Sequence, residues 1–126
     1  MNKKIIHTEK APAAIGPYSQ AVCTESLVFV SGQIAIDPSS GQLIAGDIKA
    51  QTRQVLKNLS EVLLAAGSSL DKVVKTTVFI TNMDEFGAVN EVYSEFFTTN
   101  PPARACVEVT RLPKGANVEI EAVALL

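Results

Sequence analysis

Histidine and cysteine are scarce in this sequence, which has one His, two Cys and no Trp among 126 residues. Zinc sites usually draw three or four ligands from His, Cys and carboxylate side chains. The composition therefore argues against a Cys/His zinc site, and we expect no metal site. A Ser-His-Asp or Cys-His catalytic site would have to use His7, which lies near one end of the chain and is most simply a strand or terminal residue.

An excess of positive charge and long apolar runs are absent as well. The 11 basic and 13 acidic residues give a formal net charge of -2, whereas proteins that bind nucleic acid through phosphate contacts are normally basic. The charge argues against a nucleic-acid partner. No apolar run approaches the roughly 20 residues that span a bilayer, and the N-terminal residues lack the apolar stretch of a signal peptide. We therefore expect a cytoplasmic protein with no membrane contact.

Apolar residues are abundant, at 47% of the chain. The length predicts a single domain over residues 1–126, since most domains have about 100–150 residues. Cys23 and Cys106 both lie in apolar segments. We interpret them as buried free thiols of a reducing compartment rather than as a disulfide. The high apolar content is more than a domain of this size needs for its own core.

The hydrophobic pattern predicts the element order β-β-α-β-α-β-β. Short β-branched or apolar segments predict strands at residues 21–23, 27–31, 73–80, 103–109 and 118–125. Apolar residues spaced three and four apart predict a helix from the N-cap Asp47 to a left-handed cap at Gly67. A second helix begins near Asp84, a candidate N-cap, and stops before Pro101. We expect an α+β fold, a mixed sheet with both helices on one face.

Polar residues in the last two predicted strands do not fit a simple core. Strand side chains alternate between faces, so Arg104 and Cys106 share one face of their strand, while Glu119 and Glu121 share a face with apolar residues of the last strand. One interpretation is an exposed ion pair between Arg104 and either glutamate. The other is a cleft in which the guanidinium grips a ligand carboxylate and a glutamate acts as a general base.

Other polar residues also have two interpretations. Asn90 follows Phe86 by one helical turn and either makes an interhelical hydrogen bond or contacts a ligand or neighbouring subunit. Tyr18 follows Gly16-Pro17 and is either an interface aromatic or a phenol that binds a ligand. Gly32, after Ser31, permits close approach of another backbone or of a ligand.

Several ordered motifs together carry a resemblance to a known family. They are Ala11–Ala21, Val30–Ile34, Val74–Phe79, Phe86–Tyr93, Pro102–Val109 and Val118–Ala122. With these motifs the chain resembles the Rid family, also called YjgF, and specifically its RidA branch of enamine/imine deaminases. The resemblance covers essentially the whole chain.

The resemblance implies a chorismate-mutase-like ββαβαββ fold. It also implies a homotrimer whose sheets form a central barrel, with active sites in clefts between subunits. A trimer would bury the apolar excess, because obligate interfaces are more apolar than ordinary surface. The implied reaction needs no cofactor. It hydrolyses 2-aminoacrylate and 2-aminocrotonate, or the tautomers 2-iminopropanoate and 2-iminobutanoate, to 2-oxo acids and ammonia, which protects pyridoxal-phosphate enzymes.

The resemblance also assigns roles to individual residues. Arg104 falls at the position that binds the substrate carboxylate, and Glu119 at the position that activates water. The matching positions that line the same cleft are Tyr18, Ser31, Gly32, Asn90 and Cys106, the last through its backbone. Three alternatives remain open: a non-catalytic trimer that senses keto acids or amino acids, an endoribonuclease or translation inhibitor, and a chaperone-like protein.

Overall fold

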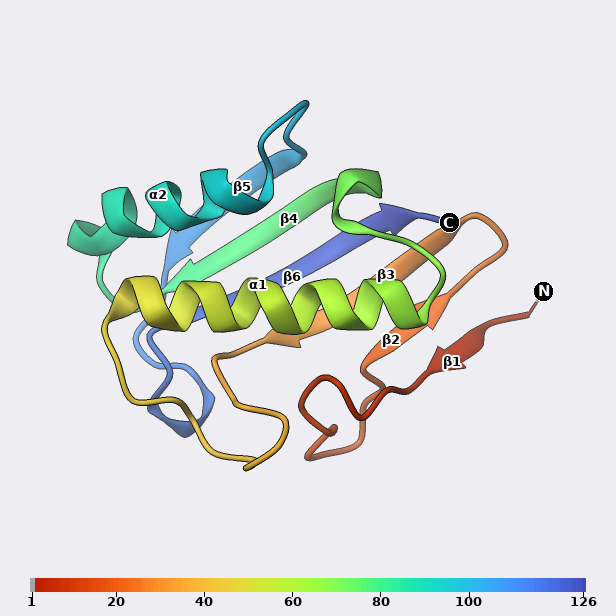
Figure 1. The fold of residues 1–126 in the computed structure, drawn as a ribbon, viewed down its shortest axis with the longest axis horizontal. Coiled ribbons are helices and arrows are strands. Elements are labelled where there is room, and N and C mark those ends of the chain that lie inside the picture. Colours follow the sequence, from red (N-terminus) through yellow and green to blue (C-terminus); the bar gives the residue numbers. More distant parts are fainter. Residues whose placement is uncertain (1) are drawn as a thin grey trace.

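A six-stranded sheet forms one layer of the structure and two α-helices form the other (Figure 1). The computed structural model describes residues 2–126. The strands are β1 (Lys4–Ile6), β2 (Ala21–Cys23), β3 (Leu27–Gln33), β4 (Val73–Ile80), β5 (Ala103–Glu108) and β6 (Val118–Leu125). The helices are α1 (Ile48–Ala65) and α2 (Phe86–Phe96), with 3-10 turns η1 (Leu70–Lys72), η2 (Met83–Glu85) and η3 (Pro113–Gly115).

The strands lie in the order β1-β2-β3-β6-β4-β5. β4 and β5 are parallel, and every other neighbouring pair is antiparallel. The predicted α+β fold with a mixed sheet and both helices on one face is therefore confirmed. The predicted element order is wrong at one point, because β1 adds a strand at the sheet edge. Its three residues are too few for a recognisable alternation, and their pairing with β2 defines the strand.

Helix α1 packs along the middle of the sheet, as its pattern predicts. Asp47 is the N-cap, with its carboxylate accepting a hydrogen bond from the Ala50 backbone N–H at 2.9 Å. Gly67 follows the helix with φ of 85°, a left-handed conformation that glycine adopts without steric cost. The predicted stripe is buried against the strands at Ile48, Thr52, Val55, Leu59 and Val62.

Helix α2 begins later than the sequence predicts. Asp84 lies inside η2, where its backbone N–H donates to the Asn82 side chain, and the α-helix starts only at Phe86. Asp84 is therefore not the N-cap of α2, because a 3-10 turn capped by Asn82 precedes the helix.

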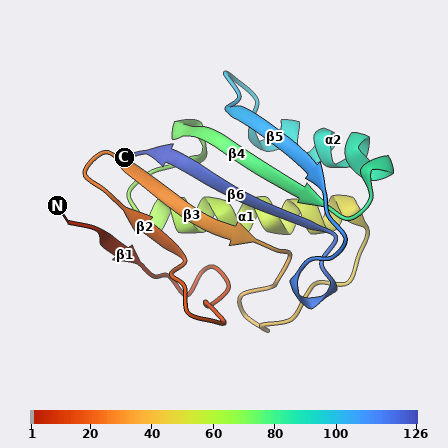
Figure 2. The ribbon, with the colours of Figure 1, turned by 180° about the vertical axis from the view of Figure 1, so that it is seen from behind.

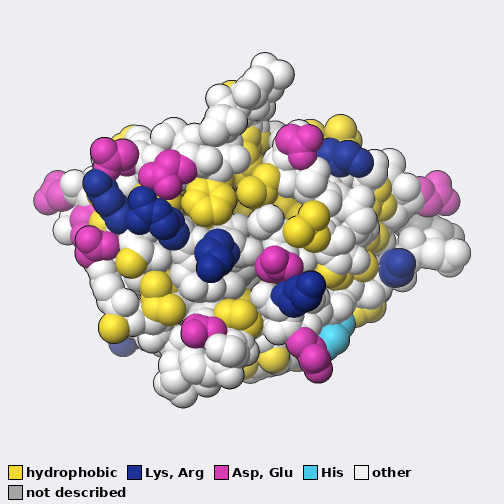
Figure 3. Space-filling model, in the orientation of Figure 1, with side chains coloured by type: hydrophobic (Ala, Val, Ile, Leu, Met, Phe, Trp, Pro, Cys, Tyr) yellow, Lys and Arg dark blue, Asp and Glu magenta, His cyan; other side chains and the backbone are white. Residues whose placement is uncertain are grey.

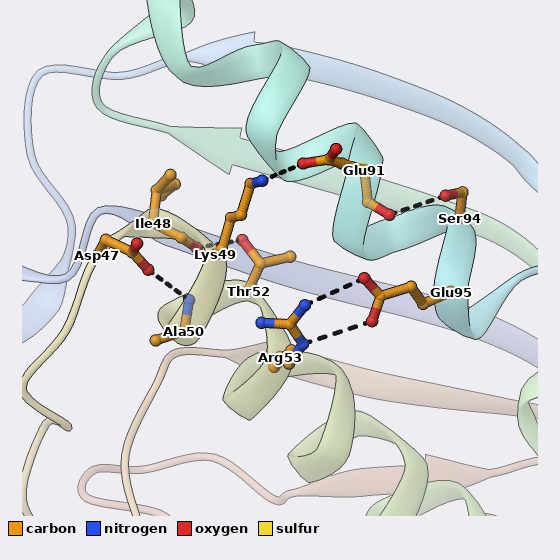
Figure 4. A network of polar contacts seen from close by, with 9 residues as sticks. All are labelled: Asp47, Ile48, Lys49, Ala50, Thr52, Arg53, Glu91, Ser94 and Glu95. Carbon is orange, nitrogen blue, oxygen red and sulfur yellow. Dashed lines mark hydrogen bonds and ion pairs between the residues drawn. The ribbon is translucent and has the colours of Figure 1, made fainter.

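Two ion pairs join the outer surfaces of the helices. Lys49 pairs with Glu91, and Arg53 pairs with Glu95 at 3.1 Å (Figure 4). Basic and acidic side chains adjoin one another on this face of the molecule (Figure 3). Both pairs are exposed and screened by solvent, so their contribution to stability is small. They connect α1 to the helix that carries Asn90.

Among residues 2–126, no helix covers the second face of the sheet (Figure 2). In β6 the residues Val118, Ile120, Ala122 and Ala124 are buried beneath the helices, so Glu119, Glu121, Val123 and Leu125 point to the open side. This face is charged at one end and apolar at the other, as the sequence predicts. Its large apolar side chains remain exposed, with Phe29 at 46% and Leu125 at 47%.

Both cysteines are free thiols, as predicted. Cys23 is buried as expected, but the prediction that Cys106 is buried is wrong, because that thiol is only half-buried. Within residues 2–126, no helix is long and apolar enough to cross a membrane.

Candidate functional site

A cavity of about 420 Å³ lies where the open face of the sheet meets the loop between β1 and β2. Its polar lining includes Tyr18, Ser31, Glu119 and Glu121. Its apolar lining is formed by Pro12, Ala13, Ile15, Ile34, Ile36 and Pro113. Four of the predicted site residues, Tyr18, Ser31, Gly32 and Glu119, thus surround one hollow.

The carboxylate of Glu119 lies directly against the backbone of Gly32. A Cβ atom added at Gly32 would lie 2.5 Å from Glu119 Oε2, so only glycine leaves room for this position of the carboxylate. Burial, and then the neighbouring charge of Glu121, raise the pKa of the Glu119 carboxyl above its ordinary value. A carboxyl with a raised pKa that faces a cavity is suited to exchanging protons with a bound molecule.

The loop over the cavity is anchored by Gln20. This buried side chain accepts from the Thr8 backbone N–H at 2.7 Å and donates to the Thr8 and Pro12 carbonyls at 3.0 and 2.8 Å. Ser31 Oγ donates to the Ser19 carbonyl at 2.6 Å. Tyr18 is 49% exposed, and its phenol oxygen accepts only a long hydrogen bond, at 3.3 Å, from the Ile15 N–H. Its ring therefore stands at the mouth of the cavity.

Arg104 lies elsewhere, on the helix-covered side of β5. Its Nη1 donates to Asn90 Oδ1 at 2.8 Å, and a shallow hollow beside it is bounded by Ser94, Pro101 and Pro102. Cys106 is on the same side of β5, packed against the core, and burial raises the pKa of its thiol. The raised pKa makes the thiol a poor nucleophile. The expected backbone role of Cys106 stays a prediction.

Arg104 and Glu119 thus lie on opposite sides of one sheet. The predicted ion pair between Arg104 and Glu119 or Glu121 is wrong, because the guanidinium turns toward α2 while both glutamates turn toward the open face. A cleft that contains both groups within one chain is excluded for the same reason. Asn90 does not make the cap-like or interhelical hydrogen bond that was one interpretation of it; its Oδ1 accepts instead from Arg104 on strand β5 and so lies beside the guanidinium.

Several residues of these two hollows were not found from the sequence. Gln20, Ile34 and Ile36 line the cavity, but apolar or amide residues at strand ends carry no signal of a site. Tyr93 lies beneath the Arg104 guanidinium, 4.8 Å from the ring centroid to Cζ. Its spacing from Phe86 and Asn90 along one helix face was the available signal, although it also suits a core residue. His7 is exposed just beyond β1.

Comparison with known families matches residues 8–126 to the family described as endoribonuclease L-PSP. Among curated relatives, the 2-iminobutanoate/2-iminopropanoate deaminase of Mus musculus is 53% identical over 98% of this chain and 91% of its own length. The human protein of the same name is 51% identical over 98% of this chain and 90% of its own.

Solved structures agree with the fold in detail. TdcF of E. coli, crystallised with bound serine, is 47% identical, covers 98% of each chain and superposes with a TM-score of 0.94. RidA from an Antarctic Psychrobacter is 45% identical, covers 98% of this chain and 99% of its own, and superposes with a TM-score of 0.94.

Proposed function

Because the chain belongs to the endoribonuclease L-PSP family, which includes RidA, we propose that it is an enzyme that hydrolyses 2-imino acids to 2-oxo acids and ammonia. The substrates are 2-iminopropanoate and 2-iminobutanoate and their enamine tautomers, 2-aminoacrylate and 2-aminocrotonate. The names of the deaminase relatives support the reaction class. The half-buried Glu119 carboxyl in the 420 Å³ cavity is the observation in this chain that carries the proposal.

Arg104 and Glu119 divide the chemistry between binding and proton transfer. A guanidinium can bind the substrate carboxylate with two parallel hydrogen bonds, which orients the C=N carbon. That carbon is already electrophilic, especially when the nitrogen is protonated. Glu119 holds a water molecule and accepts its proton as the oxygen attacks C2, and the C=N double bond becomes a single bond. The proton then passes to the nitrogen. As ammonia departs, Glu119 accepts the proton of the new hydroxyl group and the C2–O bond becomes a carbonyl.

In this proposal, the Arg104 part and the Glu119 part of the active site come together only between two chains. Since Arg104 and Glu119 lie on opposite sides of one sheet, a second copy must bring its Arg104 to the cavity that holds Glu119. The uncovered sheet face supports such an assembly, because it exposes Phe29, Val107 and Leu125 and apolar surface of this kind marks interfaces. We propose the homotrimer with a central barrel as that assembly, acting in the cytoplasm to protect pyridoxal-phosphate enzymes from the reactive imines.

The family description also names an endoribonuclease. The charge of the chain argues against RNA as the substrate. A formal net charge of -2 gives no general attraction to a phosphodiester backbone.

A coupled assay tests the deaminase. Threonine dehydratase and threonine generate 2-aminocrotonate, and the rate of 2-oxobutanoate formation is followed with and without the protein. Acceleration by the protein is expected. Glu119→Gln should lower kcat by about 10²–10⁴-fold with little change in KM, since acid–base catalysis typically contributes that much. Arg104→Ala should raise KM strongly. Full activity of Arg104→Ala would contradict the assignment, and RNA cleavage without deamination would favour the endoribonuclease.

Matched glycine variants sharpen the same assay. Gly32→Ala places a methyl group 2.5 Å from Glu119 Oε2, so the carboxylate must swing away and kcat should fall. Gly87→Ala is the control, because a Cβ there meets nothing within 4 Å and the helix favours alanine. Equal activity of the two variants would mean that the position of the Glu119 carboxylate does not affect the reaction, which would contradict its proposed role.

A further inference from the structure

The guanidinium of Arg104 lies in a slot built by one face of α2. Phe86, Asn90 and Tyr93 are spaced by four and three residues, so they project from the same side of the helix. The Arg104 Cζ atom lies 5.3 Å from the ring centroid of Phe86 and 4.8 Å from that of Tyr93. Both distances fall in the range of cation–π contacts. Asn90 Oδ1 accepts one N–H of the five that a guanidinium offers.

Two contacts, a hydrogen bond and a ring contact, hold the Tyr93 ring in place. Its hydroxyl and the Thr76 hydroxyl are joined by a buried hydrogen bond of 2.7 Å. Thr76 is fully buried on β4, directly opposite Arg104 in the β4–β5 register. On another side, the Phe97 ring packs against Tyr93 with centroids 4.6 Å apart. The ring that supports the guanidinium is thus fixed to the strand beside Arg104.

We infer that Tyr93, anchored by Thr76, is a positioning residue that holds the Arg104 guanidinium ready to bind a carboxylate; this rests on the proposed role of Arg104. A π face attracts the cation but takes up none of its N–H groups, so the remaining donors stay available to a carboxylate. An arginine side chain free in solvent loses rotamer freedom when it binds. The slot restricts the rotamers of Arg104 before the ligand binds, and preorganisation of this kind increases affinity.

The slot also assigns Thr76 a function beyond packing. A buried hydroxyl on a central strand costs free energy unless it finds a partner. The Thr76 hydroxyl is hydrogen-bonded to Tyr93, whose ring contacts the Arg104 guanidinium. The hydrogen bond therefore fixes the tilt of the ring, while the contact of the ring with the guanidinium supplies the attraction.

Three variants test the inference. For each protein we would measure the affinity for 2-oxobutanoate by calorimetry and kcat/KM for the imine in the coupled assay. The unfolding midpoint of each protein is measured as well. Tyr93→Phe keeps the ring but loses the hydrogen bond to Thr76, so it should weaken binding, though less than the loss of the ring does. Tyr93→Leu removes the π face and should weaken binding about five- to thirtyfold, the value of a cation–π contact. Val92→Ala, the control, removes buried apolar contacts of the same helix and should lower the unfolding midpoint without weakening binding.

Wild-type affinity in Tyr93→Leu would overturn the inference, and so would equal weakening in Val92→Ala, which would make Tyr93 merely a core residue. If Tyr93→Leu does not fold, Tyr93→Met fills the space with a flexible side chain and is judged by the same outcomes. A wild type that binds 2-oxobutanoate but releases no ammonia overturns the proposed function alone, and the binding comparison still decides on Tyr93. A wild type that neither binds nor deaminates overturns both.

Discussion

Glu119 combines a site in a cavity with a carboxyl whose pKa is raised, first by burial and then by the charge of Glu121. As a general base it must be ionised. Its ionised fraction falls as the pH drops through its pKa, so a raised pKa makes activity decline at a higher pH than an ordinary glutamate would.

The pH profile of kcat tests this view of Glu119. Glu121→Gln removes the like charge, so the pKa of Glu119 should fall and the acid limb of the profile should move to lower pH. Burial remains, so the shift should be partial. The measurement is kcat against pH for the wild type and for Glu121→Gln. Glu119→Gln lacks the titrating carboxyl, so its profile should show no acid limb. An acid limb at the same pH in Glu121→Gln would mean that another group titrates.

The motifs identified candidate site residues, but how these residues are arranged in one chain was not predictable from the sequence. Alternation shows that Arg104 and Cys106 share a face of β5, and that Glu119 and Glu121 share a face of β6. It does not show which face of β5 matches which face of β6. Two strand pairings through β4, one parallel and one antiparallel, set that relation.

At the scale of elements, the two helices begin in different ways. α1 has a side-chain cap from Asp47, and α2 follows a 3-10 turn in which Asp84 caps nothing. Asp47→Ala should therefore lower the free energy of unfolding by about 1 kcal/mol, the usual cost of losing an N-cap. Asp84→Ala, the matched control, should have little effect. Urea unfolding of both variants measures the difference, and equal losses would contradict the capping role.

Long, strongly patterned elements were predictable to the residue. Val73–Ile80 and Val118–Leu125 match their predicted bounds because β-branched and alternating residues continue to the ends of both strands. The edge strand β1 was missed, since its pairing partner rather than its own three residues defines it. The start of α2 was misplaced because Asp84 is a good cap by type, whereas Asn82 occupies the capping position of the turn.

At the scale of the whole molecule, the proposed shared site permits a complementation test. Arg104→Ala and Glu119→Gln chains are each expected to be nearly inactive. When they are unfolded, mixed in equal amounts and refolded together, about a quarter of the intersubunit sites should combine an intact Arg104 with an intact Glu119. Deaminase activity should therefore return in the mixture. The control is each variant refolded alone, and a mixture that stays inactive while forming mixed oligomers would contradict a site shared between chains.

The order of the strands in the sheet determines when the sheet can be completed during synthesis on the ribosome. β6 follows every other element along the chain, yet it lies between β3 and β4 and forms the seam of the sheet. Until β6 leaves the ribosome, β1-β2-β3 and β4-β5 are two separate ribbons, each with an unpaired edge that can template aggregation. The strand that carries Glu119 therefore joins the halves last, so a chain truncated before β6 lacks both Glu119 and a continuous sheet.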